Sequence, residues 1–90
     1  MIDTLAETLD IRRRRAAYRA AHRGTKEMDL MLGRYACAML PGLIDPDLAR
    51  FEQFLALPDP TLQGWLLTGA TIDGSDFAGL VADVRRFHGL

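Results

Sequence analysis

The sequence predicts an all-α fold, in which five short helices form one compact bundle. Apolar residues recur at spacings of three and four along most of the chain, and no stretch alternates convincingly between apolar and polar with period two. Prolines and glycines divide this pattern into five segments with short connections, as in bundles of neighbouring helices. The chain has 90 residues, of which 49% are hydrophobic and 26% charged, and this is typical of a single globular domain.

The first half of the chain holds two of these helices. We expect residues 1–10 to form a flexible lead-in and residues 11–88 to form the domain. The first helix is expected to end at Gly24, and its apolar or neutral side consists of Ile11, Ala17, Tyr18 and Ala21. The second helix stops at "LPGL", residues 40–43, and its predicted buried face consists of Met28, Met31, Leu32, Tyr35 and Met39.

Three more helices follow in the second half. Asp45-Pro46 and Asp59-Pro60 each join a capping acid to a proline suited to a first helical turn, and they predict the starts of the third and fourth helices. Pro58 closes the third helix, Gly69 ends the fourth, and residues 73–76 offer caps for the fifth. The predicted apolar stripes are Leu48, Phe51, Phe54 and Leu55 in the third helix, Leu62, Trp65 and Leu66 in the fourth, and Phe77, Leu80, Val81, Val84 and Phe87 in the fifth.

The charge of the chain is small overall but unevenly distributed. The net charge of −1 argues against a general binder of nucleic acid or membrane surfaces. Residues 12–26 nevertheless contain seven Lys or Arg and no acid, whereas residues 45–83 contain seven acids and one Arg. The acidic first ten residues match neither a secretory signal nor a mitochondrial presequence, and no apolar run approaches the roughly 20 residues of a membrane span. Cys37 cannot form an internal disulfide and falls inside an apolar helical pattern, so we expect a buried structural thiol in a reducing compartment such as the cytosol.

The sequence contains no pattern typical of an active site. His22 and His88 are the only histidines, and neither has a second metal ligand at helical spacing. No glycine-rich phosphate loop occurs, and Ser75, the only serine, has no visible His–Asp partnership. We therefore expect a protein that is not an enzyme.

A run of four arginines, residues 12–15, leaves several interpretations open. Spacings of three and four place Arg12, Arg15, Arg19 and Arg23 on one helix face. This face could be simply solvated, could dock on an acidic protein surface, or could bind phosphates of a nucleic acid. Tyr18 is the only aromatic residue among them, and no helix-turn-helix or RNA-binding signature surrounds them, so nucleic acid is the weakest of the three.

The stretch "AAHRGTKEMDL", residues 20–30, breaks two helical segments with a glycine. Gly24 lacks a Cβ and can adopt a left-handed cap that lets another backbone approach closely. Glu27 falls in the first turn of the next helix, where the dipole favours an acid and where its carboxylate can bond back to the backbone. These roles explain a plain helix corner. The opposite charges of Arg23 and Glu27 beside a bare backbone would also suit docking on a partner protein.

The same residues, Arg23-Gly24-Thr25-Lys26-Glu27, have the form of the RGxxE motif of the succinate dehydrogenase assembly factor 2 family. The surrounding "HRGTKEMDLMLGRYA" is similar to the basic-RGxxExD-apolar pattern of the family, and "FEQFLALPDPTLQGWLL" looks like its third helix followed by a D-P-x-L-x-x-W-L segment. The resemblance covers about residues 11 to 68 in the right order and spacing. Trp65 matches a family position, but its place on an apolar stripe favours the core.

This resemblance implies a five-helix assembly factor without a catalytic centre of its own. Such a factor binds the flavoprotein subunit of succinate dehydrogenase and promotes the covalent attachment of FAD to it. The resemblance places Arg23, Gly24 and Glu27 at the surface that faces this partner. Further candidates for partner binding are Asp29, His22, Arg19 and Arg15.

The expected cofactor, FAD, belongs to the partner, because the chain has no dinucleotide fingerprint and we expect no cofactor or metal of its own. We also expect no bound nucleic acid, no membrane insertion and a monomer when the protein is free. Two departures from the family pattern, the apolar "ACAML" at 36–40 and Gln63, bear on which flavoprotein is preferred, including fumarate reductase. The alternative is a small helical nucleic-acid-binding or adaptor protein that uses the basic face Arg12–Arg19.

Overall fold

The computed structural model describes residues 8–69 and 76–90, and within them it confirms the all-α fold with five helices and no strand. The helices are α1 (Leu9–Ala21), α2 (Lys26–Met39), α3 (Asp47–Leu55), α4 (Asp59–Thr68) and α5 (Ala78–Phe87), with a 3-10 turn, η1 (Leu40–Gly42), after α2. The expected flexible lead-in falls mostly outside the described residues, and its last two positions already belong to α1. The expected caps at 73–75 also lie outside the described residues.

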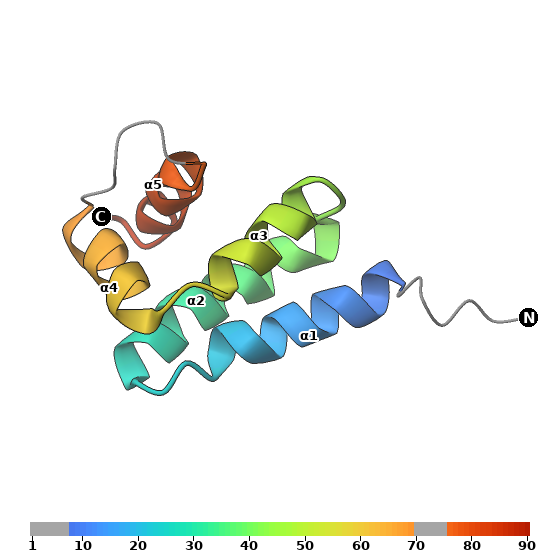
Figure 1. The fold of residues 1–90 in the computed structure, drawn as a ribbon, viewed down its shortest axis with the longest axis horizontal. Coiled ribbons are helices and arrows are strands. Elements are labelled where there is room, and N and C mark those ends of the chain that lie inside the picture. The colour runs from blue at the N-terminus through green and yellow to red at the C-terminus, as the bar shows by residue number, and fades with distance from the viewer. Residues whose placement is uncertain (1–7, 70–75) are drawn as a thin grey trace, which may run out of the picture.

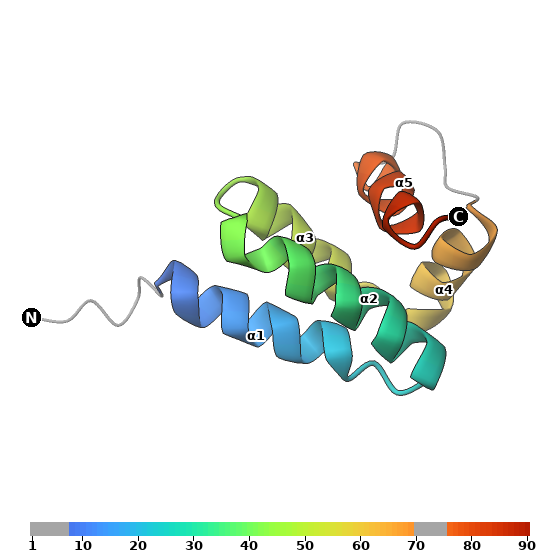
Figure 2. The same ribbon diagram turned by 180° about the vertical axis from the view of Figure 1, so that it is seen from behind.

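The helix α2 is the centre of the arrangement. Figures 1 and 2 show α1 running antiparallel along α2, with α3 above this pair and with α4 and α5 together near the start of α2. No helix in the described residues combines the length and the apolar content needed to cross a membrane. Both views also place the corner between α1 and α2 at the end of the molecule away from the start of α3.

The core is formed chiefly by α2, α3, α4 and α5. Two phenylalanines of α3, Phe51 and Phe54, are its largest fully buried side chains. The predicted stripes are confirmed in their centres: the other buried side chains of these helices are Met28, Met31, Leu32, Tyr35, Ala36, Leu48, Leu55, Leu62, Leu66, Val81 and Val84. Trp65 is partly buried against this core, with its ring centroid 6.3 Å from that of Phe77.

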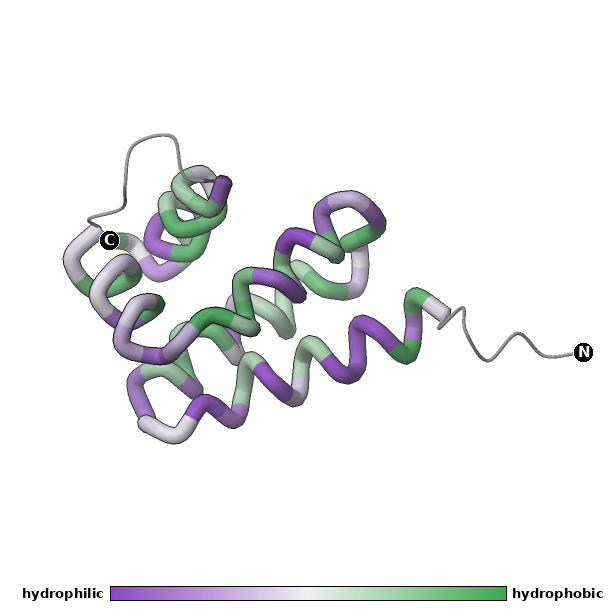
Figure 3. The backbone as a smooth tube through the Cα atoms, in the orientation of Figure 1, coloured by the Kyte–Doolittle hydropathy of each residue, from purple (hydrophilic) through white to green (hydrophobic). Residues whose placement is uncertain are grey.

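The apolar face predicted for α1 was wrong. Ile11 and Tyr18 are 45% and 65% exposed, and the buried positions are Ala16 and Ala20. The reason is a close approach of α1 and α2: a Cβ added at Gly33 would lie 3.2 Å from the Cα of Ala21. Small residues fill this interface, so the large side chains of α1 point away from it. Figure 3 shows the long hydrophilic stretches that remain on α1.

Three predicted buried positions also lie at the surface. Met39 and Phe87 are 38% and 45% exposed, because each lies in the last turn of its helix. Cys37 is exposed, so the expectation of a buried thiol was wrong. It follows the buried Ala36, and one residue turns an α-helix by about 100°, which carries Cys37 off the core side of α2.

The predicted helix ends are partly confirmed. Gly69 ends α4 in the left-handed conformation, with φ +77°, and its N–H donates to the carbonyl of Trp65 at 2.7 Å. Asp45 and Asp59 do not act as N-caps: Pro46 and Pro58 precede α3 and α4, and neither has a side-chain capping bond. Both carboxylates instead bond arginines of the segment 12–23, as described below.

Candidate functional site

The corner between α1 and α2 is a four-residue loop, residues 22–25. The helix α1 ends at Ala21, earlier than the predicted end at Gly24, with His22 as its C-cap. Gly24 has φ +117°, a backbone conformation that side chains with a Cβ rarely adopt. Thr25 is the N-cap of α2, and its hydroxyl oxygen accepts from the N–H of Met28 at 3.3 Å. The sequence therefore makes a sharp turn that only glycine fits without strain.

Asp29 holds this loop from the inside. Its carboxylate accepts hydrogen bonds from the backbone N–H groups of Arg23 and Gly24, the latter at 3.2 Å. Bonds of this kind between an anionic acceptor and backbone donors are among the stronger ones in proteins. The acid that bonds back to the backbone, which was expected to be Glu27, is therefore Asp29, two residues further along α2. Asp29, a predicted partner-binding residue, is used here to fix the corner.

Arg23 fastens the corner to the rest of the bundle. Its side chain is only 10% exposed and contacts Asp59 of α4, with an Nη2–Oδ1 distance of 2.7 Å and an Nε–Oδ1 distance of 2.9 Å. The guanidinium also donates to two backbone carbonyls at the end of α3, Leu55 at 2.7 Å and Leu57 at 3.2 Å. The expectation that Arg23 displays its charge at the surface was wrong, because these carbonyls and Asp59 draw the guanidinium inward.

The exposed part of the corner is the segment Gly24 to Glu27. All four of these residues are exposed, and a Cβ built on Gly24 would meet no atom within 4 Å. Within the described part of the chain, Glu27 makes no hydrogen bond or ion pair. The motif therefore divides into a buried holding group, Arg23, and an open surface that ends in an unpaired carboxylate.

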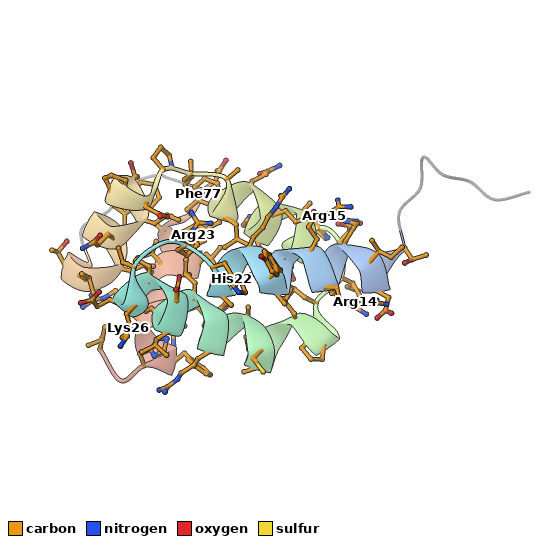
Figure 4. The ribbon with its side chains drawn as sticks, turned by 90° about the horizontal axis from the view of Figure 1, so that it is seen from below. Arg14, Arg15, His22, Arg23, Lys26 and Phe77 are labelled. Carbon is orange, nitrogen blue, oxygen red and sulfur yellow. The ribbon has the colours of Figure 1, made fainter. Side chains whose placement is uncertain are left out.

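An aromatic pair lies beside this surface on α1. The rings of Tyr18 and His22 stack with centroids 4.0 Å apart and an angle of 17° between their planes. The His22 Nδ1 lies 2.8 Å from the carbonyl oxygen of Tyr18, which fixes the ring along the helix. Figure 4 views this side of the molecule, with Arg15 and Lys26 labelled on either side of His22 along the chain. Arg19 is also exposed, so a basic and aromatic surface adjoins the corner.

The arginine run contributes mainly to internal bonds. Arg12 contacts Asp45 at 2.7 and 2.9 Å and Glu52 at 2.7 and 3.2 Å, and these hydrogen bonds raise the pKa of Arg12 and lower the pKa of Asp45. Arg13 donates to the carbonyl of Leu43 at 2.9 Å. Only part of the predicted basic face is therefore turned outward, and the structure does not bring Arg12, Arg19 and Arg23 together as one exposed surface.

The described residues contain no group of three or more His, Cys, Asp or Glu side chains that could hold a metal ion. A hollow of about 300 Å³ lies between α2, α3 and α5 and is lined in part by Tyr35 and Phe51. None of the corner residues 22–25 lines it. What the corner can do chemically is bind: it offers an anion, a cation and bare backbone within one turn.

Sequence reasoning missed two components of the site. Asp59, the partner of Arg23, was interpreted as a helix cap, and nothing in the sequence links residues 36 positions apart. Leu30, next to Asp29 on α2, is 46% exposed although it follows the motif in an apolar stretch. The sequence could have predicted the exposure of Leu30, because Leu30 falls outside the predicted buried face of α2.

Comparisons with known proteins give consistent matches. The family described as "Flavinator of succinate dehydrogenase" (Sdh5) matches residues 14–88. The chain is 40% identical over 60 residues to "FAD assembly factor SdhE" of Acetobacter pasteurianus, covering 67% of this chain and 55% of that protein. It is 33% identical over 64 residues to "Succinate dehydrogenase assembly factor 2, mitochondrial" of Debaryomyces hansenii, covering 71% and 45% of the two chains.

A third relative is aligned over most of its length. "FAD assembly factor SdhE" of Coxiella burnetii is 31% identical over 64 residues, which cover 71% of this chain and 78% of that protein. In contrast, the chain spans only about half the length of the relatives from Acetobacter and Debaryomyces. No solved structure matches the chain.

Proposed function

The chain belongs to the family of flavinators of succinate dehydrogenase, and from this premise we propose that it binds the flavoprotein subunit of that enzyme and promotes the covalent attachment of FAD to it. The observation that carries the proposal is the corner at residues 22–27. Arg23 and Asp29 fix its backbone from within, whereas Gly24 and Glu27 stay open to a partner. A surface that is rigid before binding loses less conformational entropy when it docks.

The proposed role is assistance without chemistry. The bond to FAD forms within the flavoprotein subunit, and this chain contributes none of the reacting atoms. A partner can favour one domain arrangement only by binding it better than the others, and correct placement of two reacting groups can lower a barrier by several kcal/mol. FAD is thus a substrate held by the partner, and the described residues of this chain supply a binding surface.

The relatives support further parts of the proposal. Two of them are named FAD assembly factors and come from bacteria, which supports a place in the bacterial cytoplasm beside the immature subunit. We propose that the protein acts as a monomer. The exposed part of the basic face of α1, which includes Arg19, is proposed to meet acidic groups of the same partner, whereas Arg12 and Arg13 are already bound within the protein.

A rescue experiment tests the function. In a bacterium whose own assembly-factor gene is deleted, the flavoprotein subunit is separated on a denaturing gel and its covalent flavin is measured by fluorescence. Wild-type protein should restore the signal, whereas Glu27→Ala and Gly24→Arg should not. Asp47→Ala is a matched control, because Asp47 is an exposed acid at the start of α3, far from the corner (Figure 1).

Two results would contradict the proposal. The first is a fluorescence signal that does not depend on the wild-type gene. The second is rescue by Glu27→Ala to the wild-type level, with both proteins present in equal amounts. Loss of rescue by Asp47→Ala would show that the assay does not report on the corner.

A further inference from the structure

An apolar hollow with an exposed rim lies next to the corner, and Glu27 lies between the two. It has a volume of about 280 Å³ and is formed where α2 meets the ends of α4 and α5. Three exposed leucines line it: Leu30 at 46%, Leu67 at 47% and Leu90 at 61%. The charged residues Glu27 and Arg34 stand at the same rim, and Met31 and His88 make up the rest of the lining. We call the three leucines with Glu27 and Arg34 the leucine hollow.

The charged residues of the hollow lie on one stripe of α2. Glu27, Leu30 and Arg34 are spaced by three and four, so they share a face of the helix. With a rise of 1.5 Å per residue, the two charges are about 10 Å apart along the axis. Within the described residues, neither Glu27 nor Arg34 has an ion-pair partner. The stripe therefore offers an anion and a cation with an apolar step between them.

The far wall of the hollow is held in place by specific bonds. His88 lies with its Nε2 2.7 Å from the carbonyl oxygen of Met31, which fastens the turn after α5 to α2. The N–H of Leu90 donates to the carbonyl of Arg85 at 2.8 Å, and the Nη1 of Arg85 donates to the carbonyl of Leu66 at 2.7 Å. Figures 1 and 2 both show this end of the chain beside α4. The exposed leucines are thus presented by an ordered frame.

From this arrangement we propose that the leucine hollow is a second part of the docking surface, which receives an apolar segment of the flavoprotein subunit. The inference rests on the proposed function and deepens it. Glu27 is shared between the corner and the hollow, so the two surfaces are continuous. The segment that fits places one or two apolar side chains on Leu30 and Leu67, a basic group opposite Glu27 and an acidic group opposite Arg34. Apolar anchors framed by complementary charges are typical of interface centres and rims.

Binding of the full-length chain to the purified flavoprotein subunit, measured by titration calorimetry, tests this inference. The double variant Leu30→Gln/Leu67→Gln should weaken binding roughly thirtyfold, because two half-exposed leucines lose their burial in the complex. Ile11→Gln is the matched control: Ile11 is 45% exposed on α1 and lies outside the hollow, so binding should stay within about twofold. Arg34→Gln should slow association and make it less sensitive to salt.

The outcomes separate this inference from the proposed function. If Glu27→Ala abolishes binding but the double leucine variant binds like the wild type, the proposal for the leucine hollow is overturned and the role of the corner is kept. A wild type that does not bind the subunit would overturn both. The hollow could instead receive a second copy of this chain, and sedimentation of the free protein tests this alternative. A dimer that Leu30→Gln converts to a monomer would overturn the proposal. Circular dichroism confirms that each variant is folded.

Discussion

Replacement of Arg23 by alanine is expected to lower the free energy of unfolding by about 2–4 kcal/mol. The guanidinium bonds two carbonyl oxygens of the α3 end and the carboxylate of Asp59. Hydrogen bonds to charged groups contribute about 1.5–3 kcal/mol each, which would amount to about 4.5–9 kcal/mol for three partners. Water can reach Asp59, whose side chain is 32% exposed, and it replaces part of what is lost. The smaller range follows from this hydration.

Urea unfolding followed by circular dichroism at 222 nm measures this change, with Trp65 fluorescence as a second probe. In a domain of this size each kcal/mol shifts the melting temperature by about 4–8 °C, so Arg23→Ala should melt roughly 8–32 °C below the wild type. Arg19→Ala is the matched control, because Arg19 is an exposed arginine on α1; its effect should stay within about 0.5 kcal/mol. Asp59→Ala completes a double-mutant cycle and should show coupling with Arg23.

The reasoning fails if Arg23→Ala unfolds within about 0.5 kcal/mol of the wild type. It also fails if the cycle shows that Arg23 and Asp59 act independently, since their contact at 2.7 Å is the basis of the magnitude. Glu27→Ala provides the contrast within the motif. Glu27 is exposed and makes no bond within the described residues, so its stability should equal that of the wild type while docking is lost.

Three further outcomes follow from the fold. The Tyr35 hydroxyl donates to the Asp83 carboxylate at 2.6 Å and lowers the pKa of Asp83. The stability that this bond contributes is complete above the ordinary aspartate pKa of about 4 and is lost as the pH falls through the lower pKa of the folded state. Asp83→Asn should therefore flatten the decline of the urea midpoint below about pH 5. Gly33→Val should destabilise the protein by about 1–3 kcal/mol in the same assay, because its Cβ would press on the backbone of Ala21; an unchanged midpoint would contradict this packing. Cys37 should react with a thiol reagent in the native protein at within about tenfold of its rate in urea, and a thiol that reacts only after unfolding would show that it is buried.

The sequence predicted the helices well because their signals are local. Spacings of three and four, the proline starts and Gly69 each act over a few residues, and the centres of the stripes on α2, α3 and α5 are buried as predicted. The face of α1 could not be predicted in this way. It depends on how closely Gly33 of α2 lets the two helices approach, and that is a property of the pair. Ile11 and Tyr18 were placed on the apolar or neutral side of the first helix, because hydrophobicity alone does not show which small residues will pack.

The composition of the corner was also only partly predictable. The motif marks the position of the site, and the positive φ of Gly24 agrees with the residue type. The partner of Arg23 lies 36 residues away, and a pairing at that separation leaves no local pattern. An arginine beside a glycine corner is equally compatible with an inward and an outward guanidinium. The carbonyl of Leu55, the last residue of α3, and that of Leu57 just after it decide the direction, because an α-helix leaves its last carbonyls without partners within the helix.

The corner therefore separates the requirements of folding from those of docking. Arg23 and Asp29 have their bonds inside the protein, so their loss acts through the position of the loop. Gly24 has an unusual φ but open space around it, so a side chain there would cost backbone strain of about 1–3 kcal/mol and meet no atom of the chain. That cost is below the 5–15 kcal/mol that holds a typical domain together. A large side chain at Gly24 should consequently leave a folded protein in which the proposed docking surface is covered, and we expect the glycine to matter more to the proposed partner than to the fold.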